Sequence, residues 1–441
     1  MSDTHAESAL ATAFVRREML PEKDPPVAEK GVIKWLRENL FSSVANTILT
    51  LVSIYVIYWL LSHVLGWMVN GIWDAGSLSE CREIRDARYG EGVEVACWAV
   101  LTDRWDQLMF GFYPSELYWR PVLALVLFLG AIAPVLYDGL PRKLLAFTAM
   151  SPFVLYWLLW GGTIWGPLAV AVGFVVGWVA FRFLTPIIGN LGGTIAAIVV
   201  PILYWFFAAG PLAGALGAIA PIGIEFVPSD DFGGFMLAFV IGIAGIILSL
   251  PLGIVLALGR QSDLFIINKF SVIFIEVIRG VPLIVWLFTA SLLLNYFLPP
   301  GSNFDLMLRV IIMVTLFASA YIAEVVRGGL AALPRGQYEG ADSLGLDYWQ
   351  SMRLIILPQA LKISIPGIVS TFIGLFKDTT LVVFIGLLDP IGFSNAIRAS
   401  TDWNGVYWEL FIFIGLCFFI ACYSMSRYSQ YLERKLRTDH R

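Results

Sequence analysis

The sequence has few of the residues that soluble enzymes use for their chemistry. Charged residues make up 14% of its 441 residues and hydrophobic residues 58%, which excludes an ordinary soluble protein and predicts several membrane spans. The formal net charge of −4 leaves no general basic surface for nucleic acid. Its three histidines, His5, His63 and His440, are scattered, so no metal site or acid–base cluster is expected. A Gly-x-x-x-x-Gly-Lys-Ser/Thr phosphate loop is also missing from the sequence, so ATP hydrolysis would need another polypeptide.

Cysteines are also scarce. Four of them are too few for a disulfide scaffold or for a zinc cluster of the usual spacing. Cys417 and Cys422 lie in an apolar segment and are expected to be packing residues. Cys81 and Cys97 lie in the polar segment 68–116. They can form a disulfide if that segment is extracytoplasmic, and are otherwise two unrelated thiols.

Apolar segments of spanning length predict an all-α integral membrane protein of about ten transmembrane helices. The Gly/Pro-rich run 210–224 is expected to be re-entrant or interfacial, with a sixth crossing as the alternative. The end of the first polar stretch, 31–41, suits a short interfacial helix or an extension of the first span. The expected spans are 46–67, 119–137, 144–161, 164–184, 191–209, 235–259, 272–297, 306–327, 364–388 and 407–427.

Basic residues set the orientation of the second half. The connections 260–271, 327–364 and 427–441 hold two, four and five Lys/Arg, whereas 225–234, 298–305 and 389–406 hold zero, zero and one. Eleven against one puts the first group in the cytoplasm by the positive-inside rule. Five N-terminal spans then put both termini in the cytoplasm and the loop 68–116 outside. The expected regions are a tail at 1–45, membrane regions at 46–224 and 225–427, and a tail at 428–441.

A polar stretch at 324–358 separates two of the apolar spans and predicts two short helices. Pro334 suits the first position of the first helix, and Gly345 suits its left-handed exit. Asp347 and Gln350 have the spacing of a capping box for the second helix, which is expected to end before Pro358. Such an element, exposed in the cytoplasm, could be gripped by another protein.

The same stretch resembles the cytoplasmic Glu-Ala-Ala signature of permeases in ATP-binding-cassette importers. The spacing agrees throughout, and Gly340 replaces the middle alanine. A glycine costs a helix up to about 1 kcal/mol but keeps the surface small. The residues that carry the resemblance are Glu339, Gly340, Ala341, Gly345, Ile355, Leu357 and Pro358.

Flanking motifs narrow the resemblance to polar amino-acid uptake permeases. They are Ile275–Leu283 with Glu276, Arg279 and Pro282, Tyr321–Gly329 with Glu324 and Arg327, and Leu375–Leu381 with Lys377 and Asp378. The similarity covers about 235–441. The whole chain is similar to the longer M-type permease of general L-amino-acid importers in Gram-negative bacteria.

The resemblance implies a type I importer core in the bacterial inner membrane that takes up L-amino acids of several kinds by alternating access. Its expected partners are a different second permease, two copies of a cytoplasmic ATPase that uses ATP and Mg²⁺, and a periplasmic binding protein. The chain itself is expected to bind no cofactor and to perform no bond chemistry. The residues expected to couple it to the ATPase are Arg335, Glu339, Gly340, Ala341, Gly345, Leu357 and Pro358.

Charged and hydroxyl side chains within the spans give further candidates. Lys377 and Asp378 fall near the middle of the expected span 364–388, where charges are costly. They either line the substrate pathway with Ser370, Thr371 and Thr379, or form an ion-pair network between subunits. Glu276 with Arg279, and Glu324 with Arg327, have i, i+3 spacing and are expected to be structural or gating ion pairs, with substrate contact as the lesser option.

The main alternative function is an ion-coupled secondary carrier that works alone. Such a carrier would have inverted repeats with unwound spans at matching positions. No match of that kind is evident between 46–209 and 235–427, and a solitary carrier does not need the cytoplasmic helix pair. The sequence does not decide whether the five N-terminal spans are a scaffold or support the 68–116 loop as a docking surface.

Overall fold

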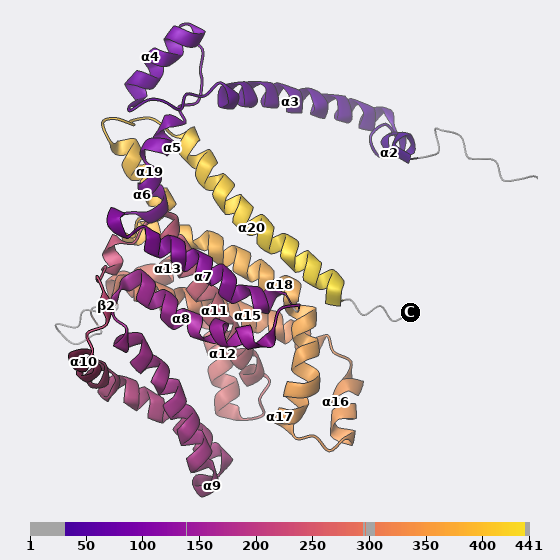
Figure 1. Ribbon diagram of the computed structural model, residues 1–441. Helices are drawn as coiled ribbons and strands as arrows, with labels where there is room; N and C mark the ends of the chain where they lie inside the picture. The colour runs from indigo at the N-terminus through magenta and orange to yellow at the C-terminus, as the bar shows by residue number, and fades with distance from the viewer. Residues whose placement is uncertain (1–30, 138, 294–295, 297–304, 437–441) are drawn as a thin grey trace, which may run out of the picture. The chain divides into compact units, whose positions relative to one another are not determined.

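The computed structural model describes residues 31–137, 139–293, 296 and 305–436, and it is almost entirely helical (Figure 1). The ends of the expected tails, at 1–30 and 437–441, and most of the expected loop 298–305 lie outside the described residues. The described chain forms two compact units. One consists of the described part of 1–71 with 92–96, and the other of 72–91 and 97–441.

The first unit contains two helices. Helix α2 (Gly31–Asn39) is separate from helix α3 (Val44–Val69), because Ser43 is extended and its hydroxyl accepts a hydrogen bond from the Asn46 amide at 3.2 Å. Of the two interpretations of 31–41, the separate short helix therefore agrees with the structure, and the extension of the first span does not. The hydroxyl of Thr50 reaches back to the Leu40 carbonyl at 2.8 Å and fixes the turn. Helix α3 is apolar on every side.

The second unit begins with short helices and continues into the apolar helices of the N-terminal half. A two-residue antiparallel ladder joins β1 to β2. The elements are α4 (Leu78–Tyr89), α5 (Ala99–Asp103), α6 (Trp105–Phe110), η2 (Ser115–Leu117), α7 (Trp119–Leu136), η3 (Arg142–Leu144), α8 (Leu145–Trp160), β1 (Gly162–Thr163), α9 (Trp165–Phe207), α10 (Ala209–Ile219), β2 (Gly223–Ile224) and η4 (Ser229–Asp231).

The remaining elements of the second unit make up its C-terminal half. They are α11 (Gly234–Arg260), α12 (Phe265–Gly280), α13 (Leu283–Phe288), the π-helix η5 (Thr289–Leu293), α15 (Leu306–Ala331), α16 (Arg335–Ser343), α17 (Tyr348–Ser351), the π-helix η6 (Met352–Ile356), α18 (Leu357–Asp378), the 3-10 helix η7 (Thr379–Ile385), α19 (Pro390–Ala399) and α20 (Trp408–Leu436).

Eight of the described helices are long and apolar enough to cross a membrane, and the number rises to ten if each of two bent pairs is one span. This agrees with the expected helical membrane fold. Helix α9 breaks at Gly189, whose φ of +75° ends the first half, so that its two parts match the expected spans 164–184 and 191–209. The run 210–224 contains α10, which bends by 51° from the part that precedes it.

Two predicted spans differ from the structure. The span expected at 272–297 is broken, because α12 ends before Pro282 and the chain turns by 101° into α13 and η5. A proline cannot continue the hydrogen-bond ladder of the preceding turn. The span expected at 364–388 begins earlier, because the continuous helical stretch runs from Tyr348 to Ile385, and its α-helix α18 ends at Asp378. The segment 379–385 then tightens into the 3-10 helix η7.

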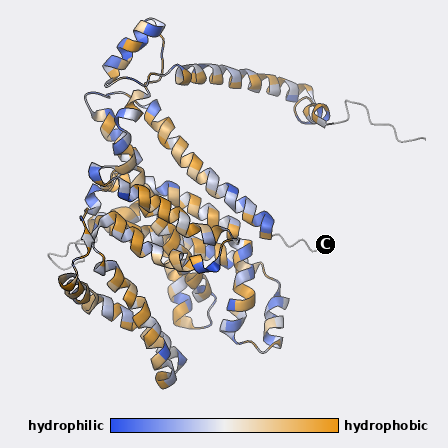
Figure 2. Ribbon diagram, viewed as in Figure 1, coloured by the Kyte–Doolittle hydropathy of each residue, from blue (hydrophilic) through white to orange (hydrophobic). Residues whose placement is uncertain are grey.

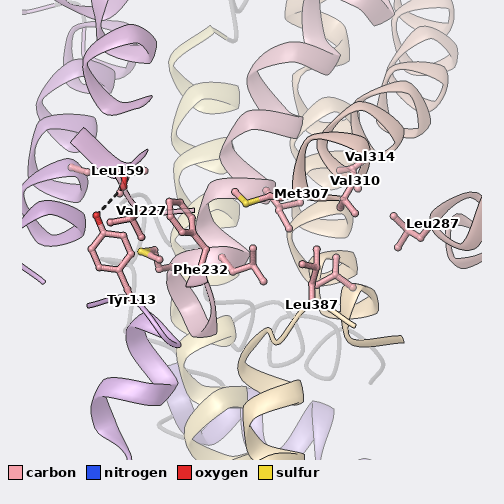
Figure 3. Close-up of a cluster of buried hydrophobic side chains, with 14 of the residues drawn as sticks. Tyr113, Leu159, Val227, Phe232, Leu287, Met307, Val310, Val314 and Leu387 are labelled. Carbon is pink, nitrogen blue, oxygen red and sulfur yellow. Dashed lines mark hydrogen bonds between the residues drawn. The ribbon is translucent and has the colours of Figure 1, made fainter. Parts of the chain in front are cut away.

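Both halves of the second unit contribute to one buried cluster. The Tyr113 hydroxyl donates a hydrogen bond to the Leu159 carbonyl at 2.8 Å, and the Tyr113 ring lies beside Phe232 (Figure 3). Met307 and Val314 from α15 belong to the same cluster. The N-terminal helices α7 and α8 therefore share a core with the C-terminal half rather than forming a separate one.

Helices α11 and α15 form the centre of the C-terminal half. Their backbones approach closely at Gly253, where an added Cβ would lie 2.6 Å from a methyl carbon of Ile322. A side chain at this position would have to push the two helices apart. The pair provides the frame from which the functional side chains project.

Candidate functional site

Helix α16 and its connection to α17 have the local structure that the sequence predicts. Helix α16 begins at Arg335, so Pro334 occupies the N-cap position, one residue before the first helical position that the sequence predicts for it. Gly345 has φ of +70°, a conformation that residues with a Cβ rarely adopt. Asp347 and Gln350 form a reciprocal capping box, with hydrogen bonds of 2.8 and 3.1 Å.

The sequence predicts that the second helix ends before Pro358, but in the structure it continues past this residue. Helix α17 continues through the π-helix η6 into α18, and Pro358 lies in the first turn of α18. A proline is tolerated in a first turn, and the wider π-turn lets the chain pass from one helix to the next without a break. The polar element is thus continuous with a membrane span.

The polar element is fixed to the rest of the molecule by contacts from α16. The Gln359 side-chain amide on α18 donates to the Gln337 side-chain oxygen at 2.9 Å. Tyr338 packs against a buried cluster that includes Met352 and Ile356, and this burial raises the pKa of Tyr338. Ala341 is only 1% exposed, so its side chain faces inward. The sequence predicts that Ala341 is among the residues that couple the permease to the ATPase.

Large apolar side chains are exposed on the same element, although its helices are mostly hydrophilic (Figure 2). Trp349 is 70% exposed, and its ring contacts Tyr348 edge to face at 5.4 Å between centroids. This surface was not predicted from the sequence. The excess of aromatic and aliphatic residues in an otherwise polar stretch was the available signal. The exposed apolar residues are Leu344, Tyr348, Trp349 and Leu354.

A cluster of charges joins α11, α12 and α15 next to this element. Glu324 on α15 is 16% exposed along its side chain, and its carboxylate oxygens lie 2.7 Å from Arg260, 3.0 Å from Arg327 and 3.5 Å from Arg279. Arg260 also pairs with Glu276 at 2.9 Å. A partly buried carboxylate held by three guanidinium groups from three helices ties the ends of those helices together.

Sequence spacing predicts one of these pairs correctly and another wrongly. Glu324 and Arg327 are paired, whereas no ion pair joins Glu276 to Arg279 among residues 31–137, 139–293 and 305–436. Arg279 instead reaches across to Glu324 and lies over the Tyr321 ring, 5.3 Å from its centroid. Arg260 was not predicted from the sequence, because its partners are on other helices.

Helix α18 and the first residue of η7 place the five candidate pathway residues in different surroundings. Ser370 and Lys377 lie seven residues apart on one exposed face, with Gly374 between them, where an added Cβ would meet nothing within 4 Å. Asp378 is half-buried and Thr379 is buried, and the Thr379 hydroxyl donates to the Phe376 carbonyl at 2.7 Å. Thr371 likewise donates to its own helix, at Gly367. Only Ser370 and Lys377 of the set are exposed.

Comparisons with known proteins give the family. A model for the inner membrane component of binding-protein-dependent transport systems matches residues 249–438. The glutamate/glutamine/aspartate/asparagine transport system permease protein BztC of Rhodobacter capsulatus is 58% identical, over 98% of this chain and 99% of its own length. The chain belongs to the amino-acid permeases of ATP-binding-cassette importers.

Other permeases of the family differ in length. The inner membrane amino-acid ABC transporter permease protein YhdY of Escherichia coli K12 is 39% identical over 92% of this chain and 93% of its own length. The probable glutamine ABC transporter permease protein GlnP of Bacillus subtilis is 32% identical, over 45% of this chain and 90% of its own length. This permease is thus one of the longer members of a family whose shorter members match less than half of it.

Membership settles the class of function. The chain is a multi-pass permease subunit through which an ATP-binding-cassette importer moves amino acids across the inner membrane. Permeases of this kind work with an ATPase, a second permease and a substrate-binding protein. These relatives speak against the solitary secondary carrier that the sequence analysis kept as its alternative.

Proposed function

We propose that this permease carries glutamate, glutamine, aspartate and asparagine from the periplasm to the cytoplasm, as one of two different permease subunits. The substrates are supported by the name of the Rhodobacter capsulatus relative. Two copies of a cytoplasmic ATPase, which use ATP and Mg²⁺, drive the cycle. Coupling to a separate ATPase is supported by the exposed apolar surface of α16 and α17, an element fixed to two spans. It is also supported by the lack of a phosphate loop in the sequence.

The ATPase contacts the outer surface of α16 and α17. Glu339 and Gly340 are exposed, and an added Cβ at Gly340 would meet nothing within 4 Å, so a partner can approach the backbone there. Trp349 supplies a large apolar area that the ATPase would bury on binding, as is typical of the centre of an interface. Ala341 is buried and packs α16 against its neighbours, whereas the half-buried Leu357 and the exposed Pro358 begin the span that is moved. Arg335 and Gly345 complete the contact set.

The charge cluster around Glu324 serves as a gate at the cytoplasmic ends of three helices. Because Glu324 joins α11 and α12 to α15, a movement of α16 transmitted through α15 changes the geometry of all three helix ends. Glu276, Arg279 and Arg327 are the other members in this proposal, with Arg260 added from the structure.

The exposed face of α18 lines the substrate pathway. The Lys377 ammonium can attract the carboxylates of acidic amino acids, and Asp378 lies beside it, suited to an α-ammonium group. The hydroxyls of Thr371 and Thr379 donate within the helix, so Ser370 is the free hydroxyl of the set. An ion-pair network with the second permease is the competing role of Lys377.

The proposed topology puts both chain ends in the cytoplasm. It is supported by the eleven Lys/Arg in the connections on one side of the C-terminal half against one on the other. Helices α16 and α17 then face the ATPase. The segment between α3 and α7, with the Cys81–Cys97 disulfide, faces the periplasm.

Reconstitution tests the proposal. The purified complex of both permeases and the ATPase, in proteoliposomes with the binding protein outside, should take up the four proposed amino acids only when ATP is inside. Uptake that persists without ATP and without binding protein would contradict it. In the same assay Glu339→Lys should leave the complex folded while ATP hydrolysis no longer drives uptake, and wild-type uptake would remove Glu339 from the coupling surface.

A further inference from the structure

A disulfide closes the segment that precedes α7. The Cys81 and Cys97 sulfurs are bonded, and both residues are buried. The Cys97 end of the loop pairs with the stretch before Cys81: the Ala99 amide donates to the Ile72 carbonyl at 2.9 Å, and Trp98 stacks on Trp73. The bond thus holds two stretches of the chain, around 72–78 and 97–104, next to each other.

The same two stretches contact the residues that lead into α20, the last span, although these residues lie about 300 positions later in the sequence. The Trp403 indole donates to Asp103 at 2.8 Å, across a separation of 300 residues, and Trp403 is fully buried. The Leu78 amide donates to the Asp402 carbonyl at 2.8 Å. Arg104 pairs with the Asp402 carboxylate at 3.5 Å. Helix α5 accordingly lies beside the beginning of α20 (Figure 1).

Glu409, in the first turn of α20, links the disulfide directly to the last span. Its side chain accepts a hydrogen bond of 2.8 Å from the amide of Cys97, one of the disulfide residues, and Glu409 is 7% exposed. No ion pair among the described residues includes Glu409. A buried carboxylate needs donors to offset its desolvation, so its environment depends on where the disulfide holds the Cys97 backbone.

We propose that the disulfide-linked stretches 72–91 and 97–104 form a brace that fixes the outer end of the last span, and that the intact Cys81–Cys97 bond is required to keep Trp403 and Glu409 buried. The brace assigns a role to part of the N-terminal extension. It holds the start of α20 in place while other core helices move. The segment is extracytoplasmic in the proposed topology, where disulfides persist. The brace does not depend on which amino acid is carried.

Hydrogen–deuterium exchange of the whole complex in nanodiscs tests the brace. In the Cys81→Ser/Cys97→Ser variant, peptides covering 397–412 should exchange at least tenfold faster than in the wild type. Peptides from α16 and α17 should be unchanged. Faster exchange in 78–97 with wild-type protection of 397–412 would overturn the proposal, because the bond would then order only its own loop.

Two further arms keep the test decisive if that variant does not assemble. Reducing agent added to the assembled wild-type complex should give the same increase at 397–412. It should also do so in the Cys417→Ser/Cys422→Ser variant, which removes the two free thiols of α20. Glu409→Ala should speed exchange in peptides that begin several residues before Cys97 and contain its amide, while the disulfide stays intact by mass, and unchanged exchange there would also overturn the proposal.

Discussion

Arg260 and Glu324 are 64 residues apart in the sequence, yet the Arg260 Nη1 lies 2.7 Å from the Glu324 Oε1. Arg260 is the last residue of α11, and Glu324 lies near the end of α15. The contact joins the two central helices of the permease at the end where α16 begins. It also links the network to α12, since Arg260 bonds to Glu276.

Arg260→Gln should weaken both stability and gating. The variant leaves Glu324, a largely buried carboxylate, with one cation fewer, and the expected loss is roughly 1–3 kcal/mol in the stability of the solubilised permease. Thermal unfolding in detergent measures this loss. ATP-driven uptake should fall with it, while binding of the ATPase is kept, since the docking surface is separate.

Arg142→Gln is the matched control for Arg260→Gln, because Arg142 is exposed and belongs to no ion pair in the described part of the chain. It should behave as the wild type. Equal unfolding temperatures for all three proteins would contradict the role of Arg260 in holding the helices.

Trp349→Ala should weaken docking of the ATPase. Exposed aromatic residues at the centre of an interface commonly contribute about 2 kcal/mol or more to binding, which corresponds to a loss of affinity of at least about 30-fold. Binding of the purified ATPase to the permease in nanodiscs measures it directly. Trp408→Ala is the control, because Trp408 is 71% exposed against 70% for Trp349 but begins α20, away from α16 and α17. Equal losses in the two variants would show that the effect is not specific to docking.

Local features of this element were predictable from the sequence, and through-space features were not. The left-handed Gly345 and the Asp347 capping box depend on a few neighbouring residues, so their spacing was sufficient. Arg260 was missed because its partners lie on α12 and α15. The inward position of Ala341 depends on how α16 packs against η6. Spacing on a single helix contains no information about such packing.

The predicted spans show the same limit. Hydropathy located them, because a run of apolar residues is sufficient evidence for a helix of spanning length. Hydropathy did not reveal the 101° turn at Pro282, because both sides of the turn are equally apolar; the proline itself was the signal for a kink. It also put Lys377 and Asp378 near the middle of a span, whereas they end α18.

Asp389 should make the stability of the permease depend on pH. Its side chain is fully buried and accepts a hydrogen bond from the Gly392 amide at 2.9 Å, at the start of α19. Burial raises the pKa of Asp389 to about 6, from 3.8. The folded state then binds the proton more tightly than the unfolded state. The stabilisation is fully present below pH 3.8 and is lost as pH rises through about 6.

Asp389→Asn should remove this dependence. The amide keeps the acceptor for Gly392 without a charge, so the variant should gain on the wild type by up to about 3 kcal/mol between pH 4 and pH 7.5. Denaturation in detergent at the two pH values measures the change. Asp230→Asn is the control, because Asp230 is exposed and belongs to no ion pair among the described residues. A wild-type pH profile in Asp389→Asn would show that other groups cause the dependence.

Gly374→Leu tests the exposed face of α18 as the substrate pathway. An added Cβ at Gly374 meets nothing within 4 Å, so the chain should still fold and assemble. If the face lines the pathway, the leucine side chain fills it and uptake should fall at least tenfold, while ATPase binding stays unchanged. Gly415→Leu on α20 is the matched control, because its Cβ also meets nothing within 4 Å. Both variants add the same side chain to an open helix surface. Wild-type uptake in Gly374→Leu would show that the pathway lies elsewhere, and failure of both variants to assemble would show that each surface is buried by another subunit.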